Sequence, residues 1–188
     1  MDAALHLFAE RGINNTTGSA LARQAGIAEG TLFRHFRSKD EILLALVTQM
    51  KERLIADVGR YLGGSSGQSG MDTVLAAVDA FYVFASGPKT EFRIIYRDVM
   101  GQYGEGSVEP LQIVKGAYTF LTAYLQGLIE KGKNDGSIRA DVNSADAAAL
   151  LLGVVVGLGR GIHFEFVANA PTLHESLKRM CMDMLAPV

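Results

Sequence analysis

The chain has 188 residues, 48% of them hydrophobic, and a formal net charge of −2, which is enough apolar material for one small module and one larger domain. A single cysteine, Cys181, excludes an intramolecular disulfide framework, and neither a signal-peptide pattern nor an apolar run of 18 residues is present. These features favour a cytoplasmic protein without a membrane partner.

Charge is distributed unevenly along the chain. Residues 11–39 carry five basic residues and one acidic residue, whereas residues 54–188 carry eleven basic and fourteen acidic residues. A local basic excess is typical of a surface that faces nucleic acid, and ordinary charge scatter on a solvated helix surface is the alternative. Residues 11–39 are therefore the candidate DNA-binding segment.

Two short helical patterns joined by a glycine follow a first helix expected over residues 1–11. Leu21, Ala22 and Ala25 form an apolar stripe on the first of the two. Gly26 permits the positive φ of a tight turn, and Ile27 is expected to anchor that turn in a core. This arrangement is typical of a helix pair that reads DNA.

The second helix of the pair is expected from about residue 28 to residue 36. Leu32, Phe33 and Phe36 fall on a flank that packs inward. The outward face carries small and polar residues, namely Glu29, Gly30, Thr31, Arg34 and His35. Such a face fits the major groove of double-stranded DNA.

These residues carry a resemblance to a known family. The run TTGSALARQAGIAEGTLFRHFRSKDE, preceded by AALHLFAERG, resembles the N-terminal domain of the tetracycline-repressor (TetR) family of transcriptional regulators over about the first fifty residues. The resemblance implies an all-α protein with a three-helix helix-turn-helix domain at residues 1–50 and a helical effector-binding and dimerisation domain at residues 51–188. It also implies a repressor that a ligand releases from its operator.

The resemblance implies nine DNA-binding residues, with base contacts near residues 29–31 and 34 and phosphate contacts at the others. They are Thr17, Ser19, Glu29, Gly30, Thr31, Phe33, Arg34, His35 and Lys39. Phosphate contacts would set register and affinity, and base contacts would set the sequence preference.

Four positions depart from the family pattern. Phe33 replaces the commoner tyrosine, and Gly18 and Ala20 replace residues that usually strengthen the first helix of the pair. Glu29 is negative where many relatives are polar or basic. Its carboxylate could accept from a cytosine amino group, or it could cap the helix and point away from DNA.

The rest of the chain repeats helical patterns. Ser38 and Glu41 form a capping box before a long fourth helix, and Asn143 is a plausible cap for the penultimate helix. Residues 63–70 are rich in glycine and serine and favour a loop. Further helices are expected at residues 71–86, 89–100, 110–131, 144–167 and 172–185, which gives about nine helices in all.

A homodimer is expected because a palindromic operator needs two reading heads. The resemblance implies a four-helix bundle made by residues 110–131 and 144–167 of each subunit, and a tightly packed monomer core is the alternative. The predicted interface residues are Leu121, Leu125, Leu151, Gly153, Val154, Gly157, Leu158 and Gly161. Small residues among them allow close approach of helices.

An effector pocket is also implied, since tyrosines and a histidine are interspersed among apolar residues. Its candidate lining residues are Tyr96, Met100, Tyr118, Tyr124 and His163, around an unknown small and largely apolar effector.

The alternatives to this function are an enzyme and a regulator of the same fold that needs no ligand. The four histidines lack metal-ligand spacing, and no cofactor motif or catalytic set is evident, so neither an enzyme nor a metal site is expected. The remaining alternative keeps the fold but acts through a protein partner, or in nucleoid or cell-division roles, without a small ligand.

Overall fold

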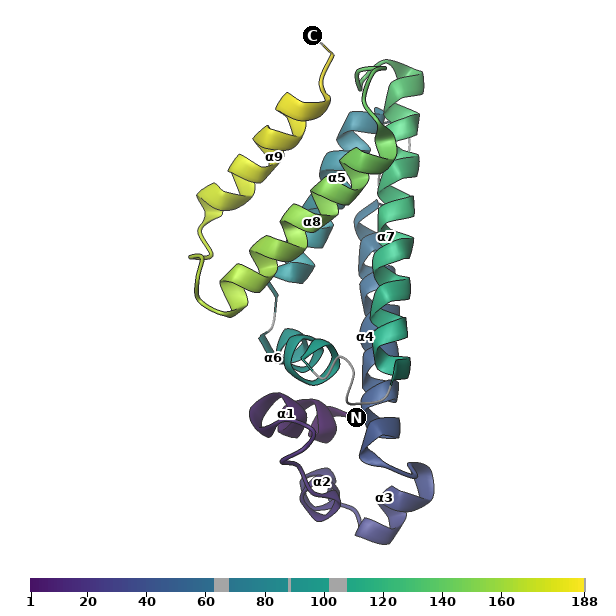
Figure 1. Cartoon of the computed structure of the whole chain (residues 1–188), viewed down its shortest axis with the longest axis vertical. Helices are drawn as coiled ribbons and strands as arrows, with labels where there is room; N and C mark the ends of the chain where they lie inside the picture. The colour runs from purple at the N-terminus through teal and green to yellow at the C-terminus, as the bar shows by residue number, and fades with distance from the viewer. Residues whose placement is uncertain (63–67, 88, 102–107, 188) are drawn as a thin grey trace. The chain divides into compact units, whose positions relative to one another are not determined.

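The computed structural model describes residues 1–62, 68–87, 89–101 and 108–187, and these residues form nine α-helices, one π-helix and no strand (Figure 1). The α-helices are α1 (Asp2–Arg11), α2 (Gly18–Ala25), α3 (Glu29–His35), α4 (Lys39–Leu62), α5 (Gly70–Ala85), α6 (Lys89–Arg93), α7 (Val108–Asp135), α8 (Ser144–His163) and α9 (Pro171–Leu185). The π-helix η1 (Ile94–Met100) follows α6 directly. The predicted all-α fold is confirmed, and most of the predicted loop at residues 63–70 lies outside the described residues.

The chain divides into two compact units. The first comprises Met1–Arg53 and Pro88–Gly116, and the second comprises Leu54–Gly87 and Ala117–Val188. The division predicted at residue 50 did not include residues 88–116 with the N-terminal helices. That segment joins the first unit because two of its side chains, Ile94 and Val99, are buried in the same core as α1 to α4.

The core of the first unit is built from the inward faces of α1 to α4 together with η1. Phe8, Leu21, Leu32 and Leu46 are all at most 7% exposed, so each of the first four helices contributes an apolar face. Helices as short as α2 and α3 are not stable alone in water. Burial of their apolar faces in this core therefore stabilises them and holds them on the rest of the unit.

Polar contacts from η1 hold the end of α1 within the first unit. The Arg97 guanidinium donates to the carbonyls of Phe8 and Ala9, and the backbone N–H of Ile13 donates to Asp98 Oδ1 at 3.3 Å. Arg97 and Asp98 also form an ion pair at 3.0 Å. The predicted single helix at residues 89–100 is therefore α6 followed by the π-helix η1, and Arg97 of η1 donates to two α1 carbonyls.

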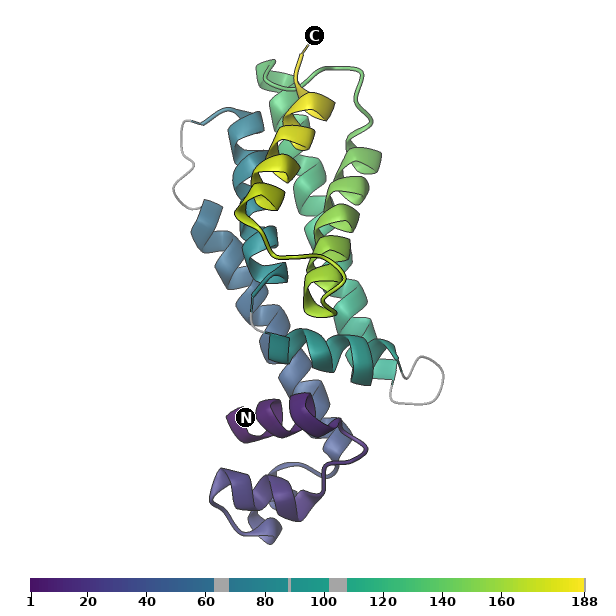
Figure 2. The same ribbon diagram turned by 90° about the vertical axis from the view of Figure 1, so that its left-hand side faces the viewer.

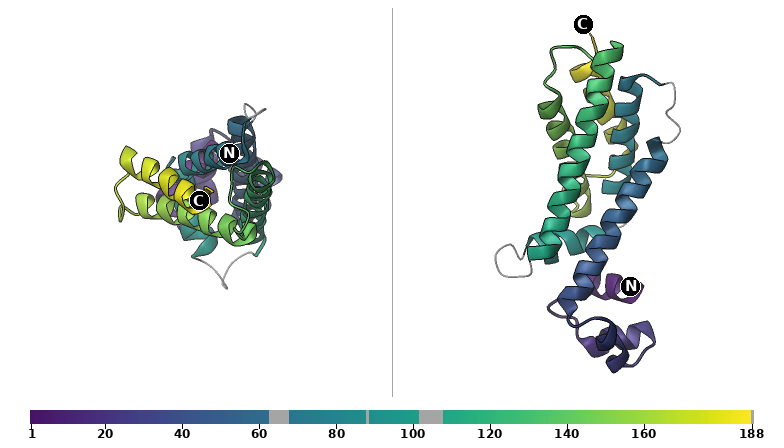
Figure 3. Two further views of the ribbon diagram at one scale, coloured as in Figure 1. Left: turned by 90° about the horizontal axis from the view of Figure 1, so that it is seen from above. Right: turned by 90° about the vertical axis from the view of Figure 1, so that its right-hand side faces the viewer.

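The second unit packs α8 and α9 against α5 (Figure 2). In the view from the other side, the later part of α7 runs beside the same group of helices (Figure 3). A Cβ at Gly159 of α8 would lie only 2.7 Å from the Cβ of Ala85, so the glycine permits the close approach of α8 to α5. The predicted end of this helix at residue 167 is wrong, because Glu165 adopts a φ of 62° and Phe166 N–H donates to the Gly161 carbonyl.

The thiol of Cys181 on α9 is buried in the second unit with 1% of its surface exposed. Burial, together with the negative charge of Asp79, raises the pKa of this thiol to about 11. In the folded protein at pH 8, we expect Cys181 to react with a soluble disulfide reagent about 100-fold more slowly than in the urea-unfolded chain. Full labelling of the native protein within the mixing time would contradict this burial.

Candidate nucleic-acid interface

The helix pair α2 and α3 is joined by the predicted tight turn. Gly26 has a φ of 68°, and Ile27 N–H donates to the Ala22 carbonyl at 3.0 Å, which closes the end of α2. The role predicted for Ile27 is wrong, because its side chain is 40% exposed. Ala25 is exposed as well, so only Leu21 and Ala22 form the inward stripe of α2.

Seven of the nine predicted DNA-binding residues are exposed, as a binding surface requires. They are Thr17, Ser19, Glu29, Gly30, Phe33, Arg34 and His35, and Thr31 and Lys39 are half-buried. Leu32 is buried between them and points into the core. The exposed residues therefore lie on the opposite side of α3 from its core contact, which leaves that face available to a groove.

The hydroxyl of Thr17 caps α2. Its Oγ1 accepts from Ala20 N–H at 3.2 Å and lies 3.2 Å from Ser19 Oγ. The two predicted hydroxyls therefore sit side by side at the start of α2, where one of them can donate to a bound phosphate.

Lys39 begins α4, and its ammonium contacts the connection between α1 and α2. Its Nζ donates to the Ile13 carbonyl at 2.8 Å and to the Asn14 carbonyl at 3.4 Å. Next to it, Glu41 N–H donates to Ser38 Oγ, and the Glu41 carboxylate accepts from Arg37 N–H rather than from Ser38 as in a full capping box. Lys39 thus has a structural role in the free protein besides its predicted phosphate contact.

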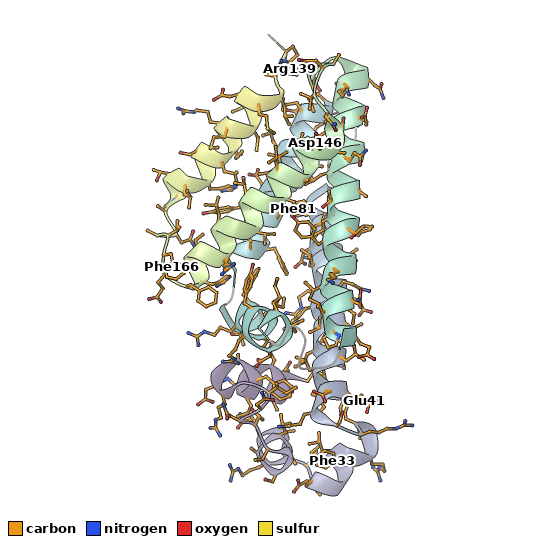
Figure 4. The ribbon with its side chains drawn as sticks, viewed as in Figure 1. Phe33, Glu41, Phe81, Arg139, Asp146 and Phe166 are labelled. Atoms are coloured by element: carbon orange, nitrogen blue, oxygen red, sulfur yellow. The ribbon has the colours of Figure 1, made fainter. Side chains whose placement is uncertain are left out.

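Phe33 lies on α3, the second helix of the pair formed by α2 and α3 (Figure 4). Its side chain is 41% exposed. The flank predicted to pack inward therefore consists of Leu32 and the partly buried Phe36 only. The Phe33 ring instead covers the first turn of α2, at Gly18.

The predicted dimer residues lie on two different faces of the second unit. Leu121, Leu125, Leu151 and Gly161 are buried within the subunit, whereas Gly153, Val154 and Gly157 are exposed and Leu158 is half-buried. A Cβ at Gly161 would meet Val167 at 2.8 Å, so this glycine serves an internal contact.

Sequence reasoning missed the residues that the same helices expose. These are Tyr118, Phe120 and Ala123 on α7 and Ala149 and Leu150 on α8. Leu150 is 61% exposed, and the Tyr118 hydroxyl oxygen lies 3.9 Å from the place of a Cβ at Gly153. The spacing of Leu121, Leu125 and Ile129 on α7 could have identified the inner stripe, and hence the outer position of Phe120 and Ala123.

The five predicted effector residues are not gathered within one unit. Tyr96 and Met100 belong to the first unit, and Tyr118, Tyr124 and His163 belong to the second. His163 is buried, and its Nε2–H donates to the Ala85 carbonyl at 2.7 Å, which ties α8 to α5. The effector site therefore stays a prediction. Among the residues that the structure describes, no group of three or more acidic, histidine or cysteine side chains could hold a metal ion.

Comparison with known proteins relates this chain to bacterial transcriptional regulators. The family model of bacterial regulatory proteins, tetR family, matches residues 1–46. The HTH-type transcriptional regulator UidR of Escherichia coli K12 is 24% identical over 185 residues, which covers 98% of this chain and 90% of UidR.

Solved structures share the fold. A structure that concerns the control of antibiotic production by bacterial hormones has a TM-score of 0.78 with 20% identity, over 98% of this chain and 94% of that chain. The regulator FadR from Bacillus subtilis, in complex with stearoyl-CoA, has a TM-score of 0.74 with 18% identity, over 97% of this chain and 96% of that chain.

Proposed function

Because the chain belongs to the tetR family of bacterial regulatory proteins and is a DNA-binding transcriptional regulator, we propose that it is a homodimeric repressor of a palindromic operator. A small and largely apolar effector releases it from that operator, and it has no catalytic role. The observation that carries this proposal is the exposed, basic outer side of α2 and α3, set on a buried core.

Two reading heads would be held together through an apolar face on α7 and α8, which we call the α7–α8 face. It consists of the exposed residues Tyr118, Phe120, Ala123, Ala149, Leu150, Gly153, Val154 and Gly157. No charged residue occurs between Asp146 and Arg160. An uncharged face with large exposed side chains and small ones between them is suited to close helix packing against a second copy.

The same face bears on the localisation. The 20-residue helix α8 is long and apolar enough to cross a membrane, but core helices of soluble proteins pass the same test. Its inner residues Ala148, Leu152 and Val155 are buried in the second unit. We therefore assign its outer side to the second subunit and propose that the dimer works in the cytoplasm.

The effector class is suggested by the largely apolar effector that the sequence predicts and by one solved structure of the same fold. FadR from Bacillus subtilis holds stearoyl-CoA. Acyl-CoA thioesters are therefore the first effectors to test. The alternative is a regulator that acts through a protein partner without a ligand. No observation among the described residues favours it over the ligand-released repressor.

The proposal is tested by selecting bound duplexes from a random pool with the purified protein and sequencing them. An inverted repeat whose half-sites are about one helical turn or more apart would support the dimeric regulator. Failure to enrich any motif at moderate salt would contradict sequence-specific binding and favour the partner-dependent alternative.

Lys39 and Thr31 are expected to act differently on DNA. Replacing Lys39 with alanine should weaken binding to all duplexes and reduce the slope of log affinity against log salt by about 1, because one phosphate contact is lost. Replacing Thr31 with valine should change the preferred base at one position of each half-site. Binding titrations at several salt concentrations on the selected and a scrambled duplex measure both effects.

Lys51, also on α4, provides the matched control, since Lys51→Ala removes the same charge at a residue without a predicted DNA contact. Because Lys39 also binds two carbonyls, its variant requires a check of thermal stability alongside the binding data. Equal effects of the Lys39 and Thr31 variants on every duplex would contradict this division of roles.

A further inference from the structure

Three departures from the family pattern meet at one place in the structure. A Cβ at Gly18 would lie 2.5 Å from Cζ and 2.6 Å from Cε2 of Phe33, and 3.0 Å from Glu29 Oε1. Carbon atoms of packed side chains do not approach so closely, because steric repulsion rises steeply below contact distance. No side chain therefore fits at residue 18 while Phe33 and Glu29 keep their positions.

Backbone conformation does not explain the glycine. Only Gly12, Gly26 and Gly136 have positive φ among the described glycines, and Gly18 is not one of them. By contrast, a Cβ at Gly26 or Gly30 in the same helix pair would meet nothing within 4 Å. What Gly18 provides is space for two side chains of α3, four residues apart on one side of that helix.

Helix α3 has few anchors of its own. It has seven residues, and its N-cap, Ala28, supplies no side-chain hydrogen bond. Leu32 holds its inner side in the core, whereas Phe33 and Glu29 contact the first turn of α2. The rotation of α3 about its own axis is therefore set by the contacts on both sides.

We propose that Gly18 is a positioning residue for DNA recognition: it leaves the space on α2 into which Phe33 and Glu29 of α3 dock, and so sets the orientation of the recognition helix. This inference rests on the proposed function, because orientation matters only if α3 reads bases. It also gives Phe33 a role that needs no hydroxyl, and it places the Glu29 carboxylate beside α2.

The test compares the wild type with Gly18→Ala, Phe33→Ala and the double variant, and uses Gly59→Ala as control. Gly59 is also a helical glycine, but a Cβ there would meet nothing within 4 Å. The probes are the duplex selected from the random pool and a scrambled duplex. Labelling with ring-13C phenylalanine, which adds no atom to the ring, gives an NMR signal of Phe33, which its absence in Phe33→Ala identifies.

Gly18→Ala is expected to weaken binding to the selected duplex about tenfold with little change on the scrambled one, and to move the Phe33 signal. In the Phe33→Ala background the same substitution should have no further effect, because the two residues act through one contact. Wild-type affinity of Gly18→Ala, or an equal loss in both backgrounds, would overturn the inference. If the wild type selects no motif, the proposed function fails instead, and an unmoved Phe33 signal would then show separately that the docking is absent.

Discussion

Replacing Leu150 with glutamate is expected to convert the homodimer to monomers and to weaken operator binding by about 100-fold or more, because a single reading head keeps only half of the operator contacts. Leu150 is 61% exposed, so a lone subunit can hold the new carboxylate in water. In the dimer the substitution would place a charge on an apolar face, where its desolvation has no compensating partner. Sedimentation velocity and binding titrations on the selected duplex measure the two effects.

Val83→Glu on α5 is the matched control for this prediction. Val83 is 45% exposed and receives the same charge, but it lies outside the α7–α8 face. A dimer that survives Leu150→Glu, or one that dissociates equally in both variants, would contradict the assignment of the α7–α8 face. Thermal unfolding of the isolated monomer would show that the subunit itself is intact.

The features that could be predicted from the sequence are those set by neighbouring residues. Gly12 and Gly26 end their helices with φ values of 83° and 68°, and the Asn143 side chain accepts from the N–H groups of Ala145 and Asp146. Each of these signals depends on a few consecutive residues, because caps and turns are local. The exposed side of the helix pair was predictable for the same reason, since helical spacing assigned Leu32 to the core and the polar residues around it to the surface.

Features that depend on distant neighbours were not predictable. Small and apolar residues make up most of the run from Gly153 to Gly161, yet its glycines differ in surroundings. Gly153 and Gly157 are exposed, whereas a Cβ at Gly159 or Gly161 would clash with Ala85 or Val167. Which glycine serves which contact depends on the helix or loop that packs there. The contacts of η1 with α1 were missed similarly, because Asp98 and Ile13 are 85 residues apart and no pattern in the sequence relates them.

Those contacts predict a large loss of stability in the first unit when Asp98 is replaced. Its side chain is buried, its Oδ1 accepts from Ile13 N–H, and its carboxylate pairs with Arg97, which in turn donates to two α1 carbonyls. Asp98→Ala leaves a buried N–H without its acceptor and a guanidinium without its counter-charge. We expect a loss of about 2–4 kcal/mol in the free energy of unfolding of the first unit.

Urea unfolding followed by circular dichroism measures this loss, and hydrogen exchange locates it. Because Ile13 carries both the Asp98 contact through its N–H and the Lys39 contact through its carbonyl, amide exchange should quicken first at the end of α1 and at residues 13 and 14. Asp98→Asn keeps an oxygen acceptor but no charge, so it should lose only part of the stability. A change below about 0.5 kcal/mol in Asp98→Ala, within the range of ordinary surface substitutions, would show that η1 does not hold α1.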